Sequence, residues 1–197
     1  GLVSYEDMAA FFEDLRYNVT NLKQVMGIGV DYTFLQYDEN SLILGELLAT
    51  DVEWIEKVSL SLECLFTANE FVVIRDIDRE WYSLLPELPV GLDWSPLLLQ
   101  EVLGAREKIG YRTIPALSGQ RTDTIHAAIV PVKSLIKNFA DFVAALLHQF
   151  GFSNRRMSSE ELRSVLKEKG VLVGGELVAS LHRALDDYRF AWSIDKK

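Results

Sequence analysis

The sequence predicts a mainly α-helical protein with minor β structure, and two observations support this prediction. All five prolines of the 197-residue chain lie between residues 86 and 131, so 1–85 and 132–197 lack the residue that most strongly interrupts helices. Apolar side chains in these flanking stretches recur three and four residues apart, which is the spacing of one helix face. The chain is 49% hydrophobic and 25% charged, which is typical of a folded domain with a core.

In the first half of the chain, capping residues followed by apolar stripes predict helices. Ser4 precedes a stripe over 5–26, and Asp51 precedes a second stripe over 52–66. Ser41 is also interpreted as an N-cap. The single cysteine, Cys64, lies inside the second stripe, so we expect a buried and unreactive thiol.

Two short segments remain ambiguous because periodicity does not distinguish strands from other structure in so few residues. Residues 31–37 are rich in aromatic and β-branched side chains, which fits a strand or a packed loop. Residues 71–74 fit a strand or the end of the preceding helix.

The middle of the chain predicts a domain boundary. Pro86, Pro89 and Gly91 indicate an extended connection, so we expect a helical domain over 1–92 and a second part over 93–197. Within the second part, a serine followed by proline at 95–96 predicts a helix start, because the hydroxyl caps and proline suits the first helical position.

The last third of the chain predicts a helix over 132–150 and a pair of helices after it. Ser158 and Glu161 have the spacing of a capping box, and Gly170 stands where a Schellman end needs glycine. A glycine-containing turn then leads to a second helix. Residues 188–194 alternate aromatic and polar side chains, which is the period of a strand.

This order of helix, short turn, helix and strand resembles a winged helix-turn-helix over 132–197, with 132–150 as the leading helix. The resemblance implies a small three-helix core with a β-wing, which is used for DNA binding and also for binding proteins. For DNA binding, the candidate contacts are the basic residues of this region: Arg155, Arg156, Arg163, Lys167, Lys169 and Arg183.

Charge is divided unevenly along the chain, whose net charge is −9. Residues 1–151 carry 11 basic and 22 acidic side chains, whereas residues 152–197 carry 9 basic and 7 acidic ones. The acidic part would repel a phosphate backbone, so nucleic acid could be bound only through the C-terminal part.

The sequence contains no recognisable catalytic, metal or cofactor motif. Its three histidines lack the spacing of a zinc site, and no glycine-rich loop joins a strand to a helix, so we expect no cofactor. Arg121, Asp123 and His126 form the one polar cluster that could support a hydrolase or transferase, although a plain loop before a helix cap explains the same residues.

These features together predict a non-enzymatic protein-interaction or regulatory module, which could belong to a larger protein or complex. The alternative is a nucleic-acid-binding regulator that uses the winged-helix-like unit. The many aromatic and apolar residues predict a protein partner or self-association, and we expect the N-terminal domain to provide the interface. A single cysteine and the absence of an apolar run of about 20 residues predict a cytoplasmic location without membrane insertion.

Overall fold

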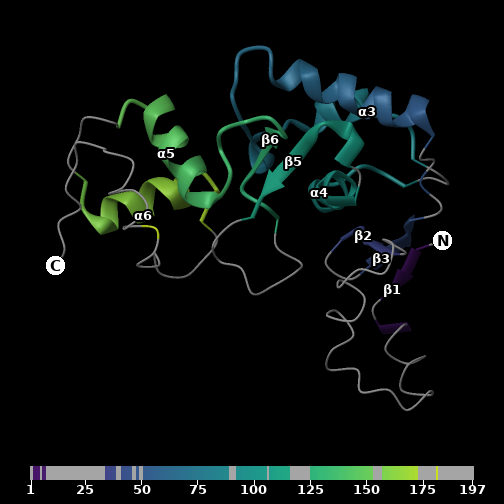
Figure 1. Ribbon diagram of the computed structural model, residues 1–197. Coiled ribbons are helices and arrows are strands. Elements are labelled where there is room, and N and C mark those ends of the chain that lie inside the picture. Colours follow the sequence, from purple (N-terminus) through teal and green to yellow (C-terminus); the bar gives the residue numbers. More distant parts are fainter. Residues whose placement is uncertain are drawn as a thin grey trace.

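The fold is mixed α/β, and the prediction of a mainly α protein is wrong. The computed structural model describes residues 2–4, 6–7, 34–38, 41–45, 48, 51–88, 92–105, 107–115, 125–152, 157–172 and 181. Within these residues, two three-stranded antiparallel sheets accompany the helices (Figure 1). Each strand has only two to four residues, which is too short for a strand period to stand out in the sequence.

The first sheet is formed near the N-terminus by β1 (Leu2–Ser4), β3 (Ser41–Leu44) and β2 (Phe34–Gln36), with β3 in the centre. The segment 31–37 therefore contains a strand. Ser41 is not an N-cap, because it begins β3 and its carbonyl accepts a hydrogen bond from the Tyr37 amide at 3.0 Å.

The second sheet has the order β4 (Val72–Val73), β6 (Ala128–Pro131) and β5 (Tyr111–Ile114). The ambiguity over 71–74 is thus resolved as a short strand, which the 3-10 helix η3 (Ile74–Asp76) follows directly. β6 pairs with both neighbours, and its side chains at 128, 129 and 130 are each 0% exposed. The central strand is therefore buried on both faces.

Two hydrophobic clusters meet at this second sheet. The α5 cluster contains, among others, Val73, Ile114, Ala128 and Val130 of the sheet, with Phe142, Leu146, Leu162 and Leu166 of the helices α5 (Phe139–Gln149) and α6 (Ser159–Glu168). The α3 cluster contains, among others, Tyr111 and Ile129 of the sheet, with Ile43 of the first sheet and Val58, Leu62, Leu98 and Leu99 of the helices α3 (Val52–Leu65) and α4 (Pro96–Ala105). Alternate residues of β6 thus supply different clusters, as the two-residue period of a strand requires.

Helix α3 (Val52–Leu65) begins where the sequence predicts, because the Asp51 side chain accepts a hydrogen bond from the Trp54 amide at 2.7 Å. Its buried face includes Trp54 and Leu62. Cys64 is exposed, so the prediction of a buried thiol is wrong: the residue lies outside the buried face of α3, which Trp54, Val58, Ser61 and Leu62 form. Next in the chain after η3 is the 3-10 helix η4 (Arg79–Leu84).

Helix α4 (Pro96–Ala105) also begins as predicted, because the Ser95 hydroxyl accepts a hydrogen bond from the Leu98 amide at 3.0 Å. α4 contacts both β5 and β2, so it connects the two sheets. The 3-10 helix η5 (Glu107–Ile109) and Gly110, with φ +82°, then lead into β5.

Helix α5 (Phe139–Gln149) begins later than the sequence predicts. The prediction of a helix from residue 132 is wrong because Pro131 ends β6, a turn follows, and Asn138 is the N-cap. Helix α6 (Ser159–Glu168) follows the prediction, since Ser158 and Glu161 form the capping box. Lys169 is its C-cap, and Gly170 follows with φ +64°, while the amides of residues 171 and 172 both donate to the Leu166 carbonyl.

Several predicted elements lie outside the described residues. They include most of the helix over 5–26, most of the second helix of the winged-helix-like unit and the strand over 188–194. The resemblance to a winged helix therefore stays a prediction. The boundary at residue 92 also stays a prediction, although packing crosses it: Trp54 stacks on Trp94 with ring centroids 5.8 Å apart, and Phe71 packs edge-on against Phe142 at 5.1 Å.

Candidate functional site

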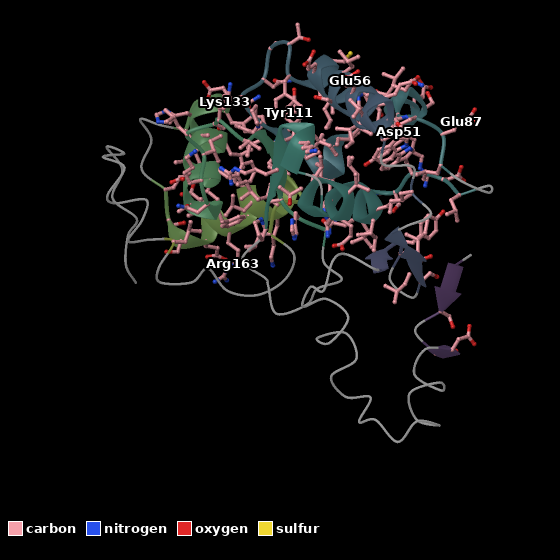
Figure 2. The ribbon with its side chains drawn as sticks, turned by 45° about the vertical axis from the view of Figure 1, so that its right-hand side comes forward. Asp51, Glu56, Glu87, Tyr111, Lys133 and Arg163 are labelled. Atoms are coloured by element: carbon pink, nitrogen blue, oxygen red, sulfur yellow. The ribbon has the colours of Figure 1, made fainter. Side chains whose placement is uncertain are left out.

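The basic residues predicted to contact nucleic acid are described only in part. Arg155, Arg156 and Arg183 lie outside the described residues. Lys167 is exposed on α6, while the Lys169 ammonium lies 4.2 Å from the centre of the Phe150 ring. Arg163 is partly buried on the same helix (Figure 2).

Helix α6 itself does not present a uniformly basic surface. It carries three glutamates, at positions 160, 161 and 168, beside Arg163 and Lys167. A helix that enters a groove of DNA usually carries several cations on one face. The described basic residues of α6 therefore add no support to the prediction of DNA binding. Nucleic-acid binding through the six residues stays a prediction.

The polar cluster around His126 is also described only in part, because Arg121 and Asp123 lie outside the described residues. His126 has partners of its own: Nδ1 lies 2.7 Å from the Thr113 hydroxyl, and the backbone amide donates to the Gln100 side-chain carbonyl at 2.8 Å. Burial lowers the pKa of His126 below its ordinary value. These contacts connect the segment before β6 with β5 and α4.

A groove of about 630 Å³ runs along one face of α5 and is a candidate site. Its walls come from α5, from the segment 68–71 and from the turn before α5. The lining residues are Ala68, Asn69, Glu70, Phe71, Leu135, Ile136, Asp141, Ala144, Ala145, His148 and Gln149. The volume lies within the roughly 300–1,000 Å³ that ligand pockets occupy.

The groove follows from the sequence of α5. Asp141, Ala144, Ala145 and His148 are spaced three and four residues apart, so they share one helix face. The two alanines have small side chains, which leave a hollow between this face and the segment 68–71. Elsewhere on the helix, Phe142 and its neighbours pack in the α5 cluster and hold α5 in place.

Asp141 is the charged side chain most deeply buried at this groove. It is 8% exposed, and its Oδ2 accepts hydrogen bonds from the amides of Lys137 at 2.6 Å and Asn138 at 3.2 Å. The Asn138 side chain accepts in return from the Asp141 amide at 3.0 Å, which completes a capping box. The other oxygen, Oδ1, is buried and has no hydrogen-bond partner among the described residues.

Leu135 lies at the edge of the same groove and is 90% exposed. Among the described residues, it is the most exposed large hydrophobic side chain. Ile136, the next residue along the chain, is buried in the α5 cluster. The turn before α5 therefore fixes an apolar side chain in solvent beside a partly apolar hollow.

A second hollow, of about 980 Å³, lies along the connection between η4 and α4. It is lined by two arginines, Arg75 and Arg79, but also by Glu87 and Asp93, so its charges do not favour one sign of ligand. Burial raises the pKa of Tyr82, which also lines it, to about 12, so that hydroxyl stays protonated. This hollow gives a weaker indication of a ligand than the groove does.

Sequence reasoning missed both Asp141 and Leu135. The available signal was the spacing of Asn138 and Asp141, a variant of the capping box in which aspartate replaces the usual glutamate. No local pattern in the sequence indicates the groove, because the wall that faces α5 comes from residues 68–71, which are far from α5 in the sequence.

Comparisons with known proteins found no matching family model, curated protein or solved structure. Among the described residues, no group of His, Cys, Asp or Glu could hold a metal ion. Within the same part of the chain, no helix has both the length and the apolar character needed to cross a membrane. Function is therefore inferred from the groove.

Protonation of His126 is expected to destabilise the protein. Its pKa is lower in the folded chain than the ordinary 6.5, so the unfolded state binds more protons in the interval between these values. The free energy of unfolding should therefore fall as the pH drops below about 6.5, and this contribution should level off below the folded pKa. Urea denaturation at about pH 7.5 and about pH 5.5 should show a smaller loss for His126→Gln than for wild type. Equal losses would contradict the prediction.

The hydrogen bonds that Asp141 accepts at the start of α5, and not its negative charge, are expected to stabilise the helix. Asp141→Asn should change the free energy of unfolding by less than about 0.5 kcal/mol, because an amide oxygen can still accept from the amides of Lys137 and Asn138. Asp141→Ala removes the cap and should cost about 1 kcal/mol. Urea denaturation of both variants measures the difference. An Asn variant as unstable as the Ala variant would show that the charge, and not the cap, stabilises the helix.

Proposed function

We propose that the protein is a protein-interaction module whose α5 groove binds an apolar segment of a partner protein. The observation that carries the proposal is Leu135, which is 90% exposed at the edge of a hollow that Phe71 and Ala144 help to line. An exposed apolar side chain beside an apolar hollow with a polar rim is typical of a surface that a partner covers.

The chemistry of the groove favours a polypeptide over a nucleic acid. Among the described residues that line it, none is Lys or Arg, whereas Glu70 and Asp141 are acidic. A phosphate backbone needs cations, so it would be repelled here. The proposed surface combines α5 with the segment 68–71, and only this segment belongs to the N-terminal domain through which the sequence predicts docking.

Burial of the Leu135 side chain by a partner would contribute to the free energy of binding. Full burial of a leucine side chain contributes about 1.5–3 kcal/mol, and almost all of this is still available while the side chain is exposed. The rim residues Asn69 and Gln149 offer amide groups that can orient a bound backbone. Burial of Leu135 would therefore contribute affinity, and the amide groups of Asn69 and Gln149 would orient the bound backbone.

Selection from a random library of 12-residue peptides displayed on phage tests the proposal. We expect the full chain to enrich peptides with a large aliphatic or aromatic anchor, and Leu135→Ser to weaken their binding by about 10-fold. Leu60→Ser is the matched control, because Leu60 is 60% exposed on α3, away from the groove. Fluorescence anisotropy with labelled copies of the enriched peptides measures each dissociation constant.

Two outcomes would contradict the proposal. One is a set of enriched peptides that bind the Leu135→Ser and Leu60→Ser variants equally well, since the groove would then not be their site. The other is concentration-dependent self-association, seen by light scattering, that Leu135→Ser abolishes. In that case a second copy of the chain, and not a different partner, covers the groove.

A further inference from the structure

We propose that the partner segment carries an aspartate or glutamate beside its apolar anchor, and that Lys133 and Lys137 bind this carboxylate next to Leu135. This inference rests on the proposed function and names the chemistry of the partner. Its starting point is the turn before α5, where the sequence sets the 90% exposed Leu135 between two exposed lysines. Lys133 is labelled in Figure 2.

The backbone of this turn brings the two lysines close to Leu135. The chain bends at Leu135, with Lys133 two residues before the bend and Lys137 two residues after it. Two residues span at most about 7 Å, and a lysine carries its charge on a flexible four-carbon stem. Ile136 is 6% exposed, so the chain turns this side chain toward the core and leaves both of its neighbours in solvent. A carboxylate next to a group packed on Leu135 is therefore within reach of either ammonium.

Arg112 and Asp141 hold the turn and offset each other's charge. The Arg112 guanidinium, which comes from β5, donates to the carbonyls of Ile136 and Lys137. On the other side of the chain, Asp141 Oδ2 accepts from the Lys137 amide at 2.6 Å. The backbone below Leu135 is thus fixed before a partner arrives, which lowers the entropy cost of binding. One guanidinium and one carboxylate carry opposite charges, so the remaining positive charge of the turn is that of the two lysines.

Both ammonium groups are available to a partner. Within the described part of the chain, neither the Lys133 nor the Lys137 side chain forms an ion pair or a hydrogen bond. Neither lysine lines the hollow itself, whereas Glu70 does, on the wall that faces α5. A carboxylate inside the hollow would be repelled by Glu70, and a carboxylate over the turn would be attracted by the lysines. The acidic residue is therefore expected at the turn, beside the anchor and outside the hollow.

An anionic lipid surface is the other class of partner that a leucine flanked by lysines could suit. Two observations favour a polypeptide. The hollow of about 630 Å³ beside Leu135 can receive a side chain, and a flat lipid surface would leave it unfilled. The chain as a whole has a net charge of −9, which opposes its approach to an anionic membrane.

The same phage library, selected in parallel on wild type and on the double variant Lys133→Gln/Lys137→Gln, tests the inference. Wild type should enrich peptides with Asp or Glu beside the anchor. The double variant should keep the anchor and lose the acidic residue, because glutamine retains a polar end group but carries no charge.

Dissociation constants measured by fluorescence anisotropy supply the quantitative comparison. At low ionic strength, Lys133→Gln/Lys137→Gln should weaken an enriched acidic peptide by about fivefold, which is the range of exposed ion pairs. Lys57→Gln/Lys167→Gln is the matched control: it also removes two positive charges, from exposed positions on α3 and α6 outside the groove, and should change binding by less than about twofold.

A change in the peptide completes the cycle. Replacing its Asp with Asn, or its Glu with Gln, should weaken binding to wild type by about fivefold and have little effect with the double variant Lys133→Gln/Lys137→Gln. If that variant does not fold, the neutral peptides on wild type still decide, because unchanged binding overturns the inference.

The outcomes separate the inference from the function on which it rests. Peptides that depend on Leu135 but show no enrichment in Asp or Glu would overturn the inference and leave the proposed function intact. Equal weakening by the two double variants would overturn it too, because only the overall charge would then matter. Failure to enrich any peptide that depends on Leu135 would instead contradict the proposed function.

Sedimentation with vesicles of phosphatidylserine and phosphatidylcholine tests the lipid alternative. We expect the wild-type chain to remain in the supernatant. Binding to these vesicles that both Leu135→Ser and Lys133→Gln/Lys137→Gln abolish would overturn the inference, because the turn would then serve a lipid surface and not an acidic segment of a protein.

Discussion

The burial of β6 on both faces is the constraint on which the rest of this structure depends. Ala128 and Val130 contribute to the α5 cluster, while Ile129 between them contributes to the α3 cluster. A strand with apolar side chains on both faces is stable only when each face is covered, as Figure 1 shows with α5 and α6 on one side and α3 and α4 on the other. Both helical layers must therefore pack before the central strand is fully removed from water.

The groove is a consequence of this packing. Helix α5 is held in place by Phe142 and Leu146 in the α5 cluster, so its alanine-containing face is left toward the segment 68–71. That segment is fixed in turn because Val72 and Val73 pair with β6. Asp141 contributes to this packing, because its Oδ2 caps the helix that covers the sheet.

Local signals in the sequence were sufficient for some elements and misleading for others. The starts of α6 and α3 follow from capping residues within a few positions, so Ser158, Glu161 and Asp51 predict them. The second sheet was missed because its pairing joins residues far apart, such as Val72 and Ile129, and because its strands are too short to show a period. The sequence predicts a helix from residue 132, whereas the preceding Pro131 is the last residue of β6 and a turn separates it from α5. The groove depends on the same distant pairing, so no local pattern could have revealed it.

Hydrogen exchange of the full chain carrying Ile129→Ala tests most directly whether β6 joins the two clusters into one cooperative unit. The substitution removes a side chain of the α3 cluster alone and should cost about 2–5 kcal/mol. Under exchange conditions that report global unfolding, the protected amides of α3 and of α5 should lose the same free energy of protection, because the helices unfold together. A loss confined to α3, with α5 protected as in wild type, would contradict the account.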